Sequence, residues 1–260
     1  GLTNFFINSI IKEDNYLFAG SDSGVFVSSN NGSNWNTAGL SEKSVKVLVT
    51  GSNKIFAGTD GSGIFITSNN GGSWNAAGLQ NQYITSLVIK GNSVFAGILG
   101  SGIYKTSDNG GSWIPVNKGL TNTDVLSLGL SDNIIFAGTY NSAFKSTDDG
   151  ASWTAVGLSD RIVFTFYTNG NNIFAGTDDG VFLSINNGDN WISKNQGMNL
   201  YTLVFSLTVA EDFIFAGTLS QSVWKRSYSE ITGIKNITGI IPTGFSLSQN
   251  YPNPFNPVTN

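Results

Sequence analysis

The 260-residue sequence contains no histidine and no cysteine. Without histidine, this segment cannot hold a Ser-His-Asp triad, a histidine general base or histidine metal ligands. Without cysteine, thiol catalysis, cysteine zinc sites and disulfides are excluded as well. No glycine-rich phosphate loop ending in Lys-Ser/Thr occurs either. We therefore expect no metal site and no cofactor.

Charge and long apolar segments are also scarce. Charged residues make up 12% of the chain, about half the usual ~25%. The net charge is -4 and the isoelectric point about 4.7, which argues against nucleic acid and anionic membrane surfaces as partners. No run of 18 apolar residues occurs, so no membrane span is expected. No signal peptide is visible after Gly1.

A tripeptide repeat dominates what is present. Phe-Ala-Gly begins at Phe18, Phe56, Phe95, Phe136, Phe174 and Phe215, so successive copies are separated by 38, 39, 41, 38 and 41 residues. Periods near 40 are typical of propeller blades and of helical arrays. We interpret the phenylalanine as a filler between adjacent units, and the alanine and glycine as positions where neighbouring backbones approach closely.

Strand chemistry decides between these architectures. Each unit holds an apolar, β-branched run such as residues 45–49, a run ending in Phe-Ala-Gly, a third run such as residues 63–66, and a fourth that begins at a tryptophan. Gly, Asn, Asp and Ser bound these runs, and no helical period appears. The sequence predicts an all-β protein, a β-propeller of about six four-stranded antiparallel blades, within residues 1–240.

A second motif, S/T-x-D/N-x-G-x-x-W, joins the third and fourth runs of five units. An Asp or Asn side chain can accept backbone N–H groups in a turn, glycine supplies positive φ, and tryptophan anchors the turn to its blade. We call these segments the box turns. Their Asx, Gly and Trp positions are Asn30, Gly32, Trp35, Asn69, Gly71, Trp74, Asp108, Gly110, Trp113, Asp148, Gly150, Trp153, Asn186, Gly188 and Trp191.

The box turns resemble the Asp-box, or bacterial neuraminidase (BNR) repeat, of sialidase-like propellers. That family includes sialidases, some polysaccharide endoglucanases, sortilin-type receptors and photosystem assembly factors, so the resemblance implies a fold and not one function. Asp108 and Asp148 could be calcium ligands or acids, but asparagine stands at the other three boxes, which favours a hydrogen-bond acceptor. Sialidase activity is not expected, because the family uses three arginines and this chain has only Arg161 and Arg226.

The repeats leave three interpretations of the sixth unit. Residues 1–4 match residues 119–122, so the chain begins in mid-repeat, and the sixth unit lacks a box turn after residues 223–226. A strand upstream of Gly1 could complete the sixth blade and close a six-bladed ring. Further blades could instead precede Gly1, or residues 231–240 could supply the last strand. We favour the closed ring of six blades.

The last 20 residues differ in character. Residues 241–260 carry Pro252, Pro254 and Pro257 within Tyr-Pro-Asn-Pro-Phe-Asn-Pro, and composition alone indicates an extended linker. The string resembles the opening of the C-terminal sorting domain of the type IX secretion system of Bacteroidetes. It implies a secreted or cell-surface bacterial protein that engages this secretion machinery, with the small sorting β-sandwich cut off after its first strand. We interpret the chain as a fragment at both ends, and as a monomer.

The function is predicted from loops. In an antiparallel meander, the second-to-third strand loops and the interblade loops lie on one face, where the resembling family places its sites. The candidate ligand-binding residues on this face are Asp60, Tyr83, Tyr140, Arg161, Asp178, Asp179 and Tyr201. We expect a non-enzymatic module that binds or displays a glycan or a protein, because the loops are short. The alternatives are a polysaccharide hydrolase using Asp60, Asp124, Asp160, Asp178 or Asp179, and a structural spacer or adhesin segment.

Overall fold

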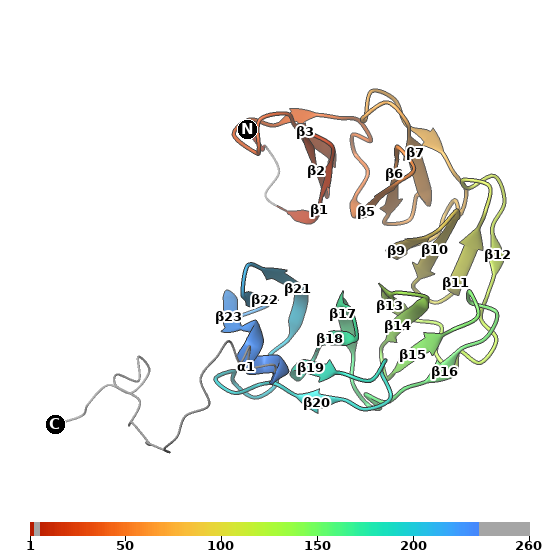
Figure 1. Cartoon of the computed structure of the whole chain (residues 1–260). Coiled ribbons are helices and arrows are strands. Elements are labelled where there is room, and N and C mark those ends of the chain that lie inside the picture. Colours follow the sequence, from red (N-terminus) through yellow and green to blue (C-terminus); the bar gives the residue numbers. More distant parts are fainter. Residues whose placement is uncertain (3–5, 234–260) are drawn as a thin grey trace, which may run out of the picture.

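Six antiparallel sheets, the blades, surround a common axis (Figure 1). The computed structural model describes residues 1–2 and 6–233. In this described part of the chain, the strands of each blade pair in chain order, five blades have four strands, and the sixth has three. The prediction of an all-β propeller with about six blades is confirmed.

The two inner strands of each blade form its core. The first strands are β1 (Ile7–Glu13), β5 (Val45–Gly51), β9 (Ile84–Lys90), β13 (Val125–Ser131), β17 (Val163–Asn169) and β21 (Val204–Ala210). The second strands carry Phe-Ala-Gly and are β2 (Tyr16–Ser21), β6 (Lys54–Thr59), β10 (Ser93–Ile98), β14 (Ile134–Thr139), β18 (Asn172–Thr177) and β22 (Phe213–Thr218).

The outer strands are shorter. The third strands are β3 (Gly24–Ser28), β7 (Ile64–Thr67), β11 (Gly102–Thr106), β15 (Ala143–Ser146), β19 (Gly180–Ser184) and β23 (Val223–Ser227). The fourth strands follow the box-turn tryptophans and are β4 (Asn36–Thr37), β8 (Asn75–Ala76), β12 (Ile114–Pro115), β16 (Thr154–Ala155) and β20 (Ile192–Ser193).

Within residues 1–2 and 6–233, the sixth blade ends in a helix and not in a fourth strand. Helix α1 (Tyr228–Thr232) follows β23 directly and ends at Gly233, which adopts the left-handed conformation with φ 72°. Residues 231–240 were one candidate for the last strand. Their described part, residues 231–233, forms the end of this helix and its cap. The rest of that segment, residues 234–240, and the predicted linker and sorting segment, residues 241–260, lie outside the described residues.

Close approach between blades depends on the glycine of Phe-Ala-Gly. A Cβ placed on Gly20 would lie 2.8 Å from Val45 Cγ1 and 3.4 Å from Leu48 Cγ, both in the next blade. We call the face that carries this glycine the C-side face of a blade, and the face that carries the Val45 and Leu48 positions the N-side face. From the second blade on, the N-side face of a blade packs on the C-side face of the blade before it, as the tripeptide predicted.

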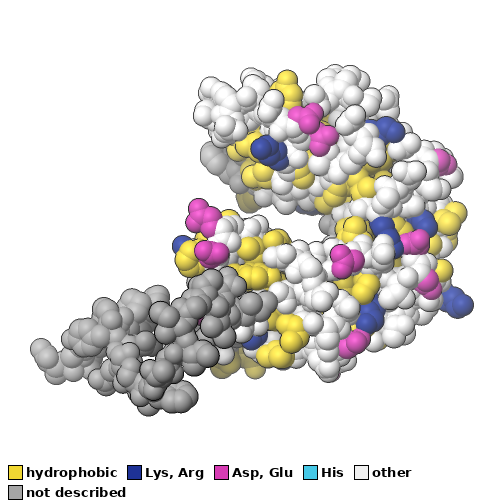
Figure 2. Space-filling model, in the orientation of Figure 1, with side chains coloured by type: hydrophobic (Ala, Val, Ile, Leu, Met, Phe, Trp, Pro, Cys, Tyr) yellow, Lys and Arg dark blue, Asp and Glu magenta, His cyan; other side chains and the backbone are white. Residues whose placement is uncertain are grey.

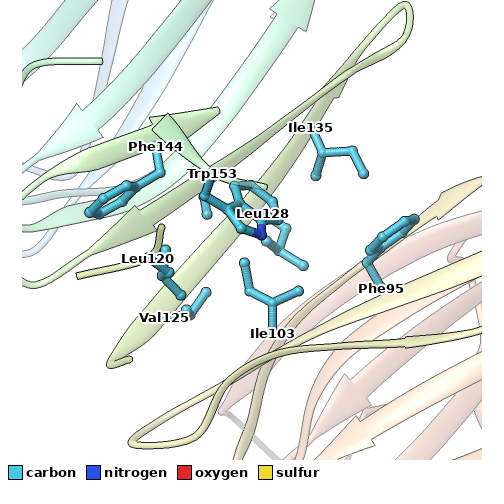
Figure 3. Packing of buried hydrophobic residues seen from close by; sticks show 9 residues of the cluster. Phe95, Ile103, Leu120, Val125, Leu128, Ile135, Phe144 and Trp153 are labelled. Atoms are coloured by element: carbon cyan, nitrogen blue, oxygen red, sulfur yellow. The ribbon is translucent and has the colours of Figure 1, made fainter. Parts of the chain in front are cut away.

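Apolar clusters span these contacts between blades. One joins Phe95 and Ile103 of the third blade to Val125, Leu128 and other residues of the fourth (Figure 3). The Phe-Ala-Gly phenylalanines of the first five blades are buried, from 0% to 2% exposed. Burying such a side chain contributes roughly 1.5–3 kcal/mol each, so the core is distributed over the blade interfaces.

The ring is open on one side. Consecutive first strands pack on one another from β1 through β5, β9, β13 and β17 to β21, and Figure 1 shows an opening between β1 and β21. The six described blades therefore leave an opening between the first and the sixth. The closed ring that we favoured requires a strand upstream of Gly1, and it stays a prediction.

Gly138→Ala tests the close approach. The added Cβ would lie 2.7 Å from both Val163 Cγ1 and the Val163 carbonyl oxygen of the next blade, so we expect the free energy of unfolding to fall by about 1–3 kcal/mol. Gly217→Ala is the matched control, because there the Cβ would meet only the Ser206 side chain of its own blade and the change should stay within about 0.5 kcal/mol. Equal effects in denaturant titrations would contradict this assignment of the glycine.

Candidate functional site

Loops from neighbouring blades are hydrogen-bonded together on the face opposite the box turns. Asp60, in a second-to-third strand loop, forms an isolated β-bridge with Tyr83 of the following interblade loop. The Leu99 N–H donates to the Tyr83 carbonyl at 3.2 Å, and the Asp160 N–H donates to the Asn141 carbonyl at 3.0 Å. The predicted juxtaposition of these two loop classes is therefore present in the structure.

A cavity of about 380 Å³ lies where the first three blades meet on this face. Tyr83 and Leu99 are 55% and 38% exposed, so the cavity offers an aromatic ring and an aliphatic group to solvent. The residues that line it are Asn8, Lys46, Asp60, Tyr83, Ile84, Thr85 and Leu99.

Charges at the cavity are centred on Lys46. Its Nζ lies 3.1 Å from Asp22 Oδ1 and 3.6 Å from Asp60 Oδ2. Asn8 Nδ2 and Ser44 Oγ also donate to Asp22 Oδ1, each at 2.8 Å. The hydrogen bonds from Asn8, Ser44 and Lys46 lower the pKa of Asp22 to about 2, so this carboxylate stays ionised at neutral pH.

The other predicted site residues lie elsewhere. Arg161 Nη2 pairs with Asp179 Oδ2 at 2.9 Å, and Asp178 Oδ1 accepts the Ile162 N–H at 3.1 Å. Tyr140 and Tyr201 are each exposed.

Of the seven candidates, Asp60 and Tyr83 line the cavity at the first three blades. Arg161 instead lines a second cavity, of about 390 Å³, beside Phe182 and Trp191. Loops that are several blades apart in sequence are held apart around the ring, which sequence spacing alone does not convey.

Asn8, Lys46 and Thr85 were not predicted. They occupy the same position, the second residue of β1, β5 and β9, on the strands nearest the axis (Figure 1). A lysine inside the apolar run of residues 45–49 is a signal that could have identified this row. In later blades the position holds Leu126, Phe164 and Phe205, and the rings of the last two lie 4.5 Å apart between centroids.

In the box turns, the Asx side chains accept hydrogen bonds within the turn. Asp108 Oδ1 accepts Thr106 Oγ1 at 2.7 Å and the Ser112 N–H at 2.9 Å, and Ser112 Oγ donates to Asp108 Oδ2 at 2.6 Å. These bonds, from the Ser112 side chain above all, lower the pKa of Asp108 well below its usual range. Asn30, Asn69, Asp148 and Asn186 accept the N–H of the residue four positions later in the same way.

The box-turn tryptophans bind across blades. Trp74 Nε1 donates to the Ala38 carbonyl at 2.6 Å, and Trp113 Nε1 to the Ala77 carbonyl at 2.7 Å. Trp153 and Trp191 donate to Val116 and Val156 in the same manner. The prediction that each tryptophan anchors the turn to its own blade was incomplete, since the indole also ties its blade to the preceding one.

Metal binding and membrane insertion are the remaining classes of site. Within 1–2 and 6–233, no group of three or more acidic residues is placed to hold a metal ion. Over the same ranges, no helix is long and apolar enough to cross a membrane.

Comparison with known proteins shows similarity to other propellers. Residues 6–85 match the family model of the DUF6242 beta propeller domain, and no curated protein matches the chain. The extracellular domain of the putative hybrid two component system BT4673 from B. thetaiotaomicron is 15% identical with a TM-score of 0.74. The alignment covers 86% of this chain and 32% of that one, so the chain spans about a third of that relative.

Two further structures have related folds. YCF48 bound to a D1 peptide is 14% identical, with a TM-score of 0.69 over 90% of this chain and 79% of that one. A GH74 xyloglucanase from Xanthomonas campestris is 11% identical, with a TM-score of 0.70 over 86% and 44% of the two chains. Likeness at such identities shows the fold alone, and these structures include both a peptide complex and an enzyme.

The pKa of Asp148 tests the box-turn geometry. Hydrogen bonds from the Ser152 side chain, the Ser152 N–H and Ser146 lower the pKa of Asp148 from 3.8 to about 2. Because the folded-state pKa is depressed, the stabilisation is complete above about pH 4 and is lost as the pH falls towards 2. We expect NMR titration to place Asp148 near 2, and Ser152→Ala to move it towards 3.8. Ser33→Ala in the first blade should leave it unchanged, and a native value near 3.8 would refute the geometry.

Proposed function

We propose that this propeller is a non-enzymatic binding module, secreted or displayed at a bacterial cell surface, whose ligand is a glycan or a protein. The observation that carries the proposal is the cavity at the first three blades. There, exposed Tyr83 and Leu99 stand beside the Lys46–Asp60 ion pair. Binding sites commonly combine an apolar surface with a few polar groups that fix orientation.

The chemistry of this cavity suits a ligand with both apolar and polar faces. The Tyr83 ring can pack on the apolar face of a sugar ring or on an aliphatic side chain. Lys46 supplies a donor and Asp60 an acceptor for hydroxyl or amide groups. These are the requirements of recognition, and they involve no bond-making step.

Hydrolysis is the second candidate function, supported by fold likeness to a GH74 enzyme. A glycosidase needs one carboxyl that is protonated at working pH and one that is ionised. Lys46 pairs with both Asp60 and Asp22. The pKa of Asp22 is lowered to about 2, so Asp22 stays ionised and does not supply the protonated carboxyl. The catalytic candidates Asp124, Asp160, Asp178 and Asp179 line neither of the two cavities described above.

Export and family complete the proposal. The residues 251–257 string supports recognition by the type IX secretion machinery, and the likeness to an extracellular domain agrees with a surface location. The shared hydrogen bonds of the five box turns support membership of the Asp-box family. A spacer or adhesin role is the alternative if no ligand is found.

Affinity measurements on the 260-residue chain test the proposal. We expect a glycan array, a polysaccharide pull-down and a peptide library to yield one ligand class, and Tyr83→Ala and Asp60→Asn to weaken its binding about tenfold each, or about 1.4 kcal/mol. Asp132→Asn, in a first-to-second strand turn on the opposite face, is the control and should bind normally.

Three results would count against this function. Unchanged affinity in both cavity variants would show that the ligand binds elsewhere on the protein. The absence of binding in all screens would favour the spacer role. Release of reducing ends from a bound polysaccharide, abolished by Asp→Asn at Asp60, Asp124, Asp160, Asp178 or Asp179, would establish the hydrolase instead.

A further inference from the structure

We propose that the opening between β1 and β21 is a docking site for one further four-stranded blade of the same repeat. This inference is independent of the proposed function. Figure 2 shows hydrophobic side chains on both walls of the opening, formed by the N-side face of the first blade and the C-side face of the sixth. Both faces correspond to surfaces that are buried at the other blade interfaces.

The first wall exposes a position that is otherwise part of the core. Ile10 pairs with Ala19 of Phe-Ala-Gly, as Leu48, Leu87 and Leu128 pair with the alanines of their own blades. These three leucines are 2%, 4% and 9% exposed, whereas Ile10 is 60% exposed. The difference arises because each leucine packs on a preceding blade and Ile10 has none.

The opposite wall shows the complementary exposure. Val223, which pairs with Gly217, is 66% exposed, whereas its counterparts Val25 and Ile64 are 1% and 0% exposed. Phe215 is half-buried, although the phenylalanines of the other five Phe-Ala-Gly copies are buried. A Cβ on Gly217 would meet no residue of another blade.

The chemistry of the occupant follows from the five occupied interfaces. To fill the sixth blade's wall, it must present a β-branched residue and a large apolar residue on its first strand, as Val45 and Leu48 do against Gly20. To cover the first blade's wall, it must carry a glycine on its second strand that receives Ile7 and Ile10. A blade of this repeat has both faces.

Direct contact between the two walls is not the arrangement in the structure. Figures 1 and 2 show a gap between the first and the sixth blade, whereas the other consecutive first strands pack on one another. The occupant to which we commit is a blade joined to the first blade as each blade is joined to the next. A second copy of the six-blade chain would instead be a heterologous contact that risks open-ended assembly.

A fusion protein tests the proposal. Residues 1–4 repeat residues 119–122, so a duplicate of residues 78–118 placed before Gly1 adds a seventh blade in register. We expect this fusion to bind less of a hydrophobic dye than the 260-residue chain and to raise the midpoint of thermal unfolding by about 5 °C or more. A second fusion with residues 39–77 repeats the test with a different blade.

The variant Ile10→Asp tests whether the added blade covers the exposed wall of the first blade. In the 260-residue chain Ile10 is exposed, so we expect no change in the unfolding midpoint. In the fusions the aspartate would be buried against the added blade. The midpoint of thermal unfolding should therefore fall by most of the increase that the added blade produced. Leu128→Asp, at the equivalent buried position, is the control and should destabilise all three proteins.

Two outcomes would overturn the proposal. If Ile10→Asp destabilises the 260-residue chain as strongly as Leu128→Asp, the wall is already covered in solution, and sedimentation would then show whether by the sixth blade or by a second copy. If both fusions retain the dye binding and the midpoint of the parent chain, the opening does not accept a blade.

Discussion

The approach of one blade to the next at the second-strand glycine is the constraint on which the structure depends. A side chain at Gly58 would lie 2.5 Å from Ile84 Cγ2 of the following blade. Leaving that space empty lets a β-branched residue and a large apolar residue of the following blade, a leucine or Phe166, pack directly on the sheet. Because the same contact between a glycine and the following blade recurs at every occupied interface, the core is a series of nearly equivalent contacts and not one central cluster.

The box turns add polar connections to this apolar series. Within each turn, the Asx oxygen satisfies backbone N–H groups that would otherwise lack partners. Across blades, the indole N–H donates to a carbonyl about 36 residues earlier in the chain. This hydrogen bond gives the partly buried indole N–H a partner. The turns on one face therefore fix the blades to one another and leave the loops on the opposite face free to differ.

Much of the fold could be predicted from the sequence, because repetition makes local signals reinforce each other. Phe-Ala-Gly and the box turns predicted the strand order, about six blades, and the role of the glycines in these two motifs. The opening between β1 and β21 could not be predicted in this way, since a repeated motif indicates the strands of a blade and not how the first and sixth blades lie relative to each other. Helix α1 was likewise not predicted, because residues 228–232 follow a strand and carry no repeat signal.

The candidate site was predicted in part. Asp60 and Tyr83 were identified because loop parity places them on one face, and the structure joins them in a β-bridge. Arg161 was grouped with them by the same rule, but it pairs with Asp179 within its own blade. Lys46 was missed because it lies in a strand, and a rule based on loops does not examine strands.

The order in which blades contact one another has a consequence for how the molecule comes apart. Each interior blade is held on two sides, whereas the first and sixth are held on one, so the array behaves as a linear chain of coupled units with two ends. Unfolding of such a chain begins at its ends and travels inward one interface at a time. A circular array has no ends, and its units must be lost together, which makes closure a source of cooperativity.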